Sequence, residues 1–192
     1  TGENRIWRSG NAAMPIAIAA AKVAWGVAGV GDFNRDRFAD ILWRNRTSGQ
    51  AVAWRSGNAA TAVGLGTVAL SWNVAGVGDF NGDGAADILW RNATNGANVM
   101  WRSGNRATPQ AVKAVGGTAW RVAGVGDFDG DLHADVLWRN ASSGQNIVWR
   151  SANAATAHAC AAVAPQWNVD GAAELDPPPP PPAPPPEPPP MP

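Results

Sequence analysis

The sequence predicts an all-β fold made of repeated units, each with four short antiparallel strands. Three observations support this prediction. The tryptophans recur at a fixed interval, each interval contains four short apolar segments separated by turn residues, and no segment has a convincing amphipathic helical pattern. A period of this size is typical of stacked supersecondary units, because one unit alone cannot bury its apolar surface.

The repeat length comes from the tryptophan positions. All 11 tryptophans fall into three series, and the intervals within each series are 47 or 48 residues. The series are Trp25, Trp72, Trp120 and Trp167; Trp43, Trp90 and Trp138; and Trp7, Trp54, Trp101 and Trp149. We expect most of these rings to pack between neighbouring units.

The middle unit shows the four strands most clearly. "NVAGVGDF" (73–80), "ADILWRN" (86–92), "ANVMWRSG" (97–104) and a looser Ala/Val-rich segment at about 107–116 are the expected strands, in chain order. A tight hairpin is expected between the second and third strands at "TNG" (94–96), with "TSG" (47–49) and "SSG" (142–144) in the other units. Glycine supplies the positive φ that such turns need.

The first strand of each unit carries alternating glycines, at positions 29 and 31, 76 and 78, and 124 and 126. Glycine weakens a strand unless another backbone must come close. The innermost strands of a β-propeller converge on its axis, where small residues fit. We therefore predict β-propeller blades of four antiparallel strands and about 47 residues each.

The chain divides into repeats over 1–176 and a proline-rich linker over 177–192. We expect three full blades plus partial N- and C-terminal units: a partial unit at 1–23, full units at 24–70, 71–117 and 118–165, and a partial unit at 166–176. Either a small four-blade ring closes, or the chain is a segment of a larger ring, which we favour. Self-association is a further way to close the ring.

Residues 177–192 differ in kind, because 13 of these 16 residues are proline. Such a tail adopts polyproline II, a semi-rigid rod of about 50 Å at about 3.1 Å per residue. We expect a spacer to another domain or to a surface, and the alternative is a proline-rich ligand for a recognition domain.

Composition argues against several functions. The formal net charge is zero, so the chain lacks the excess of basic residues that binding to nucleic acid would need. No apolar run approaches the roughly 18 residues of a membrane span. No nucleophile motif or phosphate loop stands out, and only His133 and His158 could act as neutral-pH bases. We therefore expect no enzyme.

The acidic residues are concentrated in three nine-residue loops. Ten of the 15 Asp and Glu residues follow the pattern D-x-[N/D]-x-D-x-x-x-D. Oxygen side chains at positions 1, 3, 5 and 9, with a backbone carbonyl at position 7, suit a calcium ion, which takes six to eight oxygens. The alternative is a set of Asx turns that cap the backbone without metal. Three copies of one ligand pattern favour calcium, with about three sites.

The stretches 27–45, 74–92 and 122–140 resemble the FG-GAP, or VCBS, repeat of integrin-type β-propellers, and the resemblance covers about 1–176. The resemblance implies calcium ligands at Asp32, Asn34, Asp36 and Asp40; at Asp79, Asn81, Asp83 and Asp87; and at Asp127, Asp129, Asp131 and Asp135. Backbone oxygens at position 7 come from Phe38, Ala85 and His133.

The three loops are not equivalent. Only the middle one has glycine at position 6, Gly84, where the others have Arg37 and Leu132. A left-handed backbone there is costly for both of these residues. The first loop also carries Arg35, so we expect it to bind calcium most weakly.

The recurring "WRN" and "WRS" triplets place an aromatic ring beside polar donors, as in many sugar-binding sites. We expect a carbohydrate-binding or adhesive module of a secreted or cell-surface protein, with glycans or a surface protein as partners. The alternatives are tryptophans packed between blades with arginines stacked on them, and a structural spacer or scaffold without a ligand. The candidate ligand residues are Trp43, Arg44, Asn45, Trp54, Arg55, Trp90, Arg91, Asn92, Trp101, Arg102, Trp138, Arg139, Asn140, Trp149 and Arg150.

Overall fold

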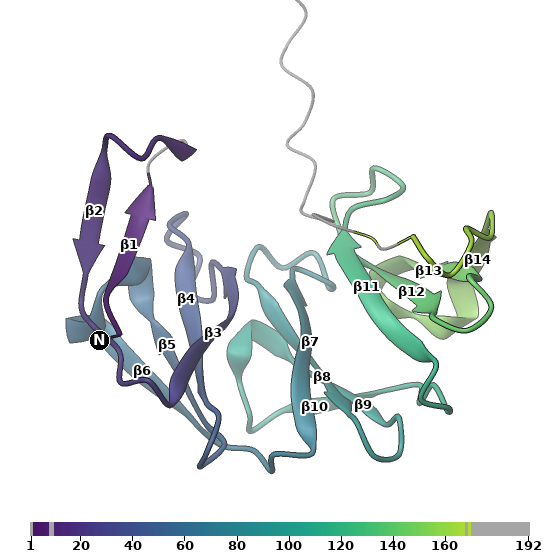
Figure 1. The fold of residues 1–192 in the computed structure, drawn as a ribbon, viewed down its shortest axis with the longest axis horizontal. Helices are drawn as coiled ribbons and strands as arrows, with labels where there is room; N and C mark the ends of the chain where they lie inside the picture. The colour runs from purple at the N-terminus through teal and green to yellow at the C-terminus, as the bar shows by residue number, and fades with distance from the viewer. Residues whose placement is uncertain (1, 8–9, 168, 170–192) are drawn as a thin grey trace, which may run out of the picture.

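The computed structural model describes residues 2–7, 10–167 and 169, and over these residues the fold is all-β. It contains three four-stranded antiparallel sheets and one two-stranded hairpin, with no α-helix in the described part. The sheets stand side by side in an arc that does not close into a ring (Figure 1). The proline-rich segment 177–192, and most of the partial unit 166–176, lie outside the described residues.

Strand order within each sheet follows the chain, so each sheet is a simple meander. The hairpin pairs β1 (Asn4–Trp7) with β2 (Pro15–Ile18). The first sheet contains β3 (Trp25–Gly31), β4 (Asp40–Asn45), β5 (Gln50–Trp54) and β6 (Ala62–Thr67). The second contains β7 (Trp72–Gly78), β8 (Asp87–Asn92), β9 (Asn98–Trp101) and β10 (Pro109–Val112). The third contains β11 (Trp120–Gly126), β12 (Asp135–Asn140), β13 (Asn146–Trp149) and β14 (Ala157–Cys160). The four strands expected in each sheet are present.

The turns explain how each meander is closed. Gly49, Gly96 and Gly144 have φ of 75°, 72° and 74°, which confirms the expected hairpin glycines between the second and third strands. A short 3-10 turn follows each third strand and was not anticipated: η2 (Arg55–Gly57), η4 (Arg102–Gly104) and η5 (Arg150–Ala152). The serine inside each of these turns has a positive φ of 48° or 49°.

The apolar core lies between neighbouring sheets. Trp90 packs in a cluster with Leu42, Ile88 and Trp101, together with Phe33 and Leu65 of the first sheet's unit. Trp138 packs likewise with residues of the second unit, among them Phe80, Leu89 and Met100. The expectation that tryptophans fill the space between units is confirmed for these two rings. Because burying a large aromatic side chain contributes roughly 1.5–3 kcal/mol, these contacts hold the arc together.

The alternating glycines of the first strands have a different neighbour from the one expected. A Cβ atom built on Gly29 would lie 2.5 Å from Val77 Cγ2, so β3 and β7 pack with no room for a side chain there. Gly76 faces Val125 of β11 in the same way. A valine side chain of the next sheet, rather than a backbone, therefore requires glycine at these positions.

Replacing Gly76 by alanine should destabilise the protein by about 1–3 kcal/mol, because the new methyl group overlaps Val125 at a packed sheet interface. Gly64→Ala is the matched control: Gly64 also lies in a strand, but a Cβ there meets no atom within 4 Å. Urea unfolding of both variants measures the difference. Equal stability of the two variants would show that the glycines do not set the sheet spacing.

Candidate functional site

The three acidic loops connect the first and second strands of each sheet, at 32–40, 79–87 and 127–135. Their first aspartate directly follows a first strand, and their last aspartate begins a second strand. Each loop therefore sits at the same corner of its sheet, and its two ends are held by adjacent, paired strands.

The ninth loop position is the most buried. The three aspartates there, Asp40, Asp87 and Asp135, are 0% exposed. In the middle loop, Asp87 Oδ2 accepts a hydrogen bond from the Phe80 amide at 3.2 Å, and Oδ1 accepts one from the Ser103 amide at 2.8 Å. The other two loops repeat both bonds. Each buried carboxylate thus joins the loop to the turn after the third strand.

The first loop position organises the loop backbone. Asp127 Oδ1 accepts hydrogen bonds from the amides of residues 129, 130 and 131, and Oδ2 accepts one from the Leu132 amide at 2.9 Å. Asp32 and Asp79 bind their own loops in the same manner. The loop is wrapped around one carboxylate, so its oxygen ligands are arranged by the fold itself.

This wrapping requires left-handed backbone at the sixth position, as expected. Gly84, Arg37 and Leu132 have φ of 82°, 68° and 69°. A left-handed residue with a side chain costs roughly 1–2 kcal/mol, so the first and third loops carry strain that the middle loop lacks. Arg35 adds a second such residue to the first loop, with φ of 63°.

Positions 3 and 5 complete the network of Asx turns. The side-chain oxygens at position 3, of Asn34, Asn81 and Asp129, accept from the amide at position 5. The aspartates at position 5, Asp36, Asp83 and Asp131, accept from the amides of Phe38, Ala85 and His133. The capping geometry named as the alternative to metal binding is therefore present in all three loops.

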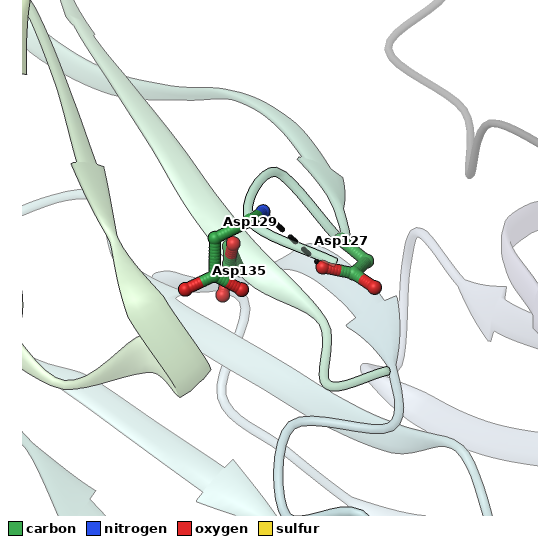
Figure 2. Close-up of side chains that lie close together, drawn as sticks. All are labelled: Asp127, Asp129 and Asp135. Atoms are coloured by element: carbon green, nitrogen blue, oxygen red, sulfur yellow. Dashed lines mark hydrogen bonds between the residues drawn. The ribbon is translucent and has the colours of Figure 1, made fainter. Parts of the chain in front are cut away.

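The third loop gathers its carboxylates most tightly. One oxygen each of Asp127, Asp129 and Asp135 lies within 4.8 Å of the others (Figure 2). Hard oxygen donors at this spacing fit a calcium ion better than zinc, which prefers nitrogen and sulfur ligands. Asp131 and the position 7 carbonyls stay predicted ligands.

Burial and neighbouring charges raise the pKa of the position 9 carboxyls in the middle and third loops, whereas the pKa values of Asp36, Asp83 and Asp127 are lowered. Burial raises the pKa of Asp87 to about 6, and the charges of Asp79 and Asp83 add to the shift. Burial also raises the pKa of Asp135, with the charges of Asp129 and Asp131 contributing. A raised pKa means that the negative charge is disfavoured in the folded protein. A bound cation would relieve that cost.

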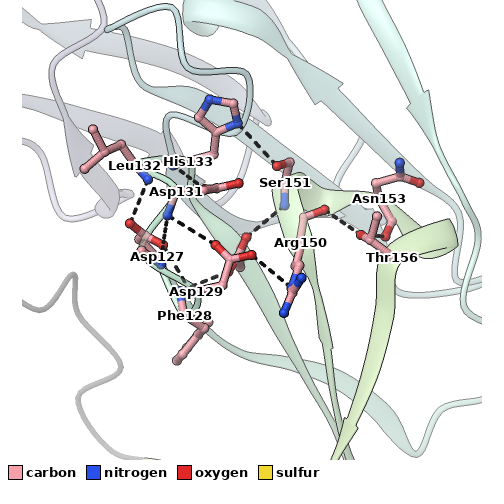
Figure 3. A network of polar contacts seen from close by, with 12 residues as sticks. Asp127, Phe128, Asp129, Asp131, Leu132, His133, Arg150, Ser151, Asn153 and Thr156 are labelled. Atoms are coloured by element: carbon pink, nitrogen blue, oxygen red, sulfur yellow. Dashed lines mark hydrogen bonds and ion pairs between the residues drawn. The ribbon is translucent and has the colours of Figure 1, made fainter.

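Two arginines place positive charge on these loops. Arg35 Nη2 lies 2.8 Å from Asp83 Oδ2, so an arginine of the first loop pairs with the middle loop. Arg150 Nε lies 2.9 Å from Asp129 Oδ2 in the third loop (Figure 3). The Arg35 side chain therefore reaches the neighbouring unit, and weakest calcium binding by the first loop stays a prediction.

The tryptophans proposed as sugar platforms lie inside the fold. Trp43, Trp90 and Trp138 are 3%, 1% and 1% exposed, and each packs against the tryptophan of the third strand in its own sheet. Those partners are Trp54, Trp101 and Trp149, of which the last two are also buried. A tryptophan ring whose faces are covered cannot stack on a sugar. The prediction that these buried tryptophans bind a sugar is therefore wrong.

The arginine of each "WRN" triplet is a hub that donates several hydrogen bonds to backbone carbonyls, and it is buried at Arg44 and Arg139 and half-buried at Arg91. Arg139 is 1% exposed and donates to the carbonyls of residues 144, 163, 164 and 167 and to the Asn146 side chain. Arg91, one unit earlier, and Arg44, two units earlier, make most of the corresponding bonds. Arg44 also lies 4.9 Å from the ring centre of Trp90, and Arg91 4.9 Å from that of Trp138. These arginines connect one unit to the next, which agrees with the packing alternative.

The remaining candidate ligand residues divide into two groups. The side-chain oxygens of Asn45, Asn92 and Asn140 accept from amides two and three residues later, so they shape the hairpin turns. Arg55 and Arg102 stay exposed, at the turns after the third strands.

Arg102 lines a cavity of about 710 Å³ between the second and third sheets. Gln110, Lys113, His133 and Asn153 are among its other polar lining residues. It is the largest of the described cavities that contains one of the candidate ligand residues.

Sequence reasoning missed the serines after the third strands. The amides of Ser56, Ser103 and Ser151 hold the buried aspartates, and each serine follows its aspartate by 16 residues. That constant separation in all three units was the available signal.

Comparison with known proteins identifies a family. A family model described as "FG-GAP-like repeat" matches residues 32–90 and 79–138, which together span more than half of the chain. Neither the curated proteins nor the solved structures contain a significant match.

Replacing Arg139 by methionine should lower the free energy of unfolding by roughly 1.5–3 kcal/mol, because the buried guanidinium no longer donates to four backbone carbonyls. Arg55→Met is the control, since this arginine is exposed, and it should change stability by less than about 0.5 kcal/mol. Chemical denaturation measures both. A small effect at Arg139 would show that the hub is dispensable.

Proposed function

The chain belongs to the family of FG-GAP-like repeats, and from this premise we propose that it is a calcium-stabilised, non-catalytic binding module of a secreted or cell-surface protein. The observation that carries the proposal is the third loop, where three carboxylates converge without a full complement of positive charge. Such repeats are typical of extracellular and cell-surface proteins. They generally serve as repeat modules rather than catalysts.

Calcium is the ion that best suits the donor set. Residues at positions 1, 3, 5 and 9 of each loop would hold it through oxygen atoms, as in Asp127, Asp129, Asp131 and Asp135. The ion would supply charge neutralisation and no reaction chemistry. Its contribution would be to secure the start of each second strand, because the buried aspartate at position 9 opens that strand.

The arc of sheets supports a β-propeller segment rather than an independent small fold. Each sheet packs face to face on the next through residues at corresponding positions of the repeat. The first strands line the concave side of the arc (Figure 1). We propose the unit boundaries 24–70, 71–117 and 118–165 for the blades, with 177–192 as a linker. In the described residues, no helix is long and apolar enough to cross a membrane.

Calcium should raise the melting temperature of the protein, and a chelator should reverse the rise. An ion at 100 times its dissociation constant stabilises a single site by about 2.7 kcal/mol, so occupied loops give a large shift. Calorimetric titration should find up to about three ions. Asp129→Asn, which gives the third loop the donor pattern of the other two, should weaken binding there without abolishing it.

The thermal melts with calcium and with chelator can also contradict the calcium proposal. If calcium and chelator leave the melting temperature unchanged, the Asx-turn network alone holds the loops and the calcium proposal fails. Magnesium at equal concentration serves as the control, because its stricter octahedral geometry should give a smaller shift.

Carbohydrate binding is the second candidate function, and the cavity between the second and third sheets favours it. Arg102, Lys113, Gln110 and Asn153 line this cavity and offer donors suited to hydroxyl groups. It replaces the buried tryptophans as the place where a glycan would bind. A scaffold role without a ligand is the alternative.

A glycan array probed with calcium present should show binding that Arg102→Ala reduces at least tenfold. Arg55→Ala removes an exposed arginine at the equivalent position of the first sheet, outside this cavity, and should leave binding unchanged. Absence of binding across the array would leave the scaffold role as the better description.

A further inference from the structure

The cavity between the second and third sheets is a place where the repeated units differ. Its lining includes the turn η4, the strand β10 and the residue that follows this strand. Three of its polar residues have no polar counterpart 47 or 48 residues earlier, where Gln110, Lys113 and His133 are replaced by Val63, Gly66 and Ala85. The polar lining is therefore a property of this one interface and not of the repeat.

The first interface has a side chain of its own in the corresponding region. Arg106 lies against Gly66 there, with Nη1 2.7 Å from a Cβ atom built on that glycine. At the second interface the same two positions hold Ala154 and Lys113, and both of these residues line the cavity. The cation thus comes from the opposite sheet, and the small alanine leaves space beside it.

Arg102 lacks the ion pair that its counterpart in the third unit makes. Arg150 Nε lies 2.9 Å from Asp129 Oδ2, and Asp129 is at position 3 of the third loop. The middle loop has the neutral Asn81 at position 3, and Asn81 itself lines the cavity. The sequence therefore places an amide where Arg102 would otherwise find a carboxylate.

The positive charge in the cavity is not compensated by the described residues. Asp83, the next carboxylate of the middle loop, is already paired with Arg35. The side chains of Arg102 and Lys113 have no hydrogen bond or ion pair in the described part of the chain. None of the residues that line the cavity is acidic. Two free cations therefore border one open space.

We propose that this cavity binds an acidic glycan, a sugar chain with carboxylate or sulfate groups, and that Arg102 and Lys113 recognise its negative charge. The inference rests on the carbohydrate-binding function proposed above and adds the class of sugar. Arginine and lysine donate strong, charge-assisted hydrogen bonds to such oxygens. Gln110 and Asn153 offer amide donors and acceptors for the hydroxyl groups of the sugar.

The two cations lie at opposite ends of β10. Trp101 pairs with Pro109 at the start of this strand and Arg102 follows Trp101, whereas Lys113 follows the last residue of the strand. At about 3.3 Å per residue, the strand separates these two ends by roughly 13 Å. A ligand with acidic groups along its length fits this arrangement better than a small anion does.

A nucleic acid is also a chain of negative charges, but the cavity suits it less. No tryptophan lines the cavity, and Phe80, which does, is only 2% exposed. The cavity therefore lacks the exposed aromatic rings on which unpaired bases stack. Its amide side chains are suited to the hydroxyl groups of a sugar instead.

Calorimetric titration with matched pairs of oligosaccharides tests the proposal. One pair is tetragalacturonic acid and its methyl ester, and the other is sulfated and unsulfated cellotetraose. We expect the acidic member of at least one pair to bind at least tenfold more tightly than its neutral counterpart, because hydrogen bonds to charged groups are stronger. The pair that shows the difference distinguishes carboxylate from sulfate. Added salt should weaken binding of the acidic member, because it screens the charges.

Calcium is kept at one fixed concentration in every titration. The acidic side chains of the middle and third loops lie close in sequence to Asn81 and His133 in the cavity wall. The calcium ions proposed for these loops would neutralise those side chains, so a constant calcium concentration keeps the charge around the cavity constant.

Lys113→Gln should lower the affinity for the acidic member about tenfold and leave the affinity for the neutral member unchanged. Lys22→Gln is the matched control, because it removes the same charge from another exposed lysine. Lys22 precedes the first sheet and does not line the cavity, so both affinities should stay unchanged.

Equal affinity within both pairs, or an undiminished preference for the acidic member in Lys113→Gln, would overturn the acidic-glycan proposal and leave carbohydrate binding standing. The glycan array separates the remaining cases. Neutral glycans bound on the array, with no binding in either pair, would overturn this proposal alone, and an array without any binding would overturn both. A DNA oligonucleotide that binds as tightly as the acidic sugar would assign the cavity to nucleic acid and overturn the proposal.

Discussion

The buried carboxylate at the start of each second strand is the constraint on which the rest of the unit depends. Asp87 is fully enclosed, and its two oxygens bind amides from two segments that are far apart in sequence, the loop before it and the turn after the third strand. A buried charge without such partners would cost several kcal/mol, so loop, strand and turn must adopt their positions together. These hydrogen bonds hold the loop to the turn, and a bound ion would add stability to the same geometry.

The aromatic and cationic residues meet a different requirement, which is to hold separate sheets at a fixed spacing. Tryptophan fills the space between two sheets, arginine stacks on it, and glycine admits the valine of the next sheet. All three recur because the interface recurs. Repetition of a residue type is thus a sign of packing at least as much as of binding, and a ligand site is better sought where the copies differ, as in the polar cavity between the second and third sheets.

Much of the fold was predictable, because the period, the turn glycines and the alternation of apolar residues each have a local physical cause. The left-handed backbone at Arg37 and Leu132 followed from comparison with Gly84. Contacts between units were not predictable in this way. The pairing of Arg35 with Asp83, and the hub made by Arg139, depend on which side chains the arc brings together, and no spacing along one unit encodes that. The burial of Trp43, Trp90 and Trp138 was one of two open alternatives for the same reason.

The arginines of the "WRN" triplets connect each unit to the unit that follows it in the chain. Arg44 and Arg91 each belong to one unit, yet some of their acceptors are the opening residues of the next, Trp72 and Trp120. Losing the unit that follows removes acceptors from a buried cation, whereas losing the unit that precedes leaves the hub of the next unit intact. Cooperativity between units is therefore unequal along the chain. Local unfolding should begin more readily at the N-terminal end of the arc, and each unit acts as a cap for the one before it.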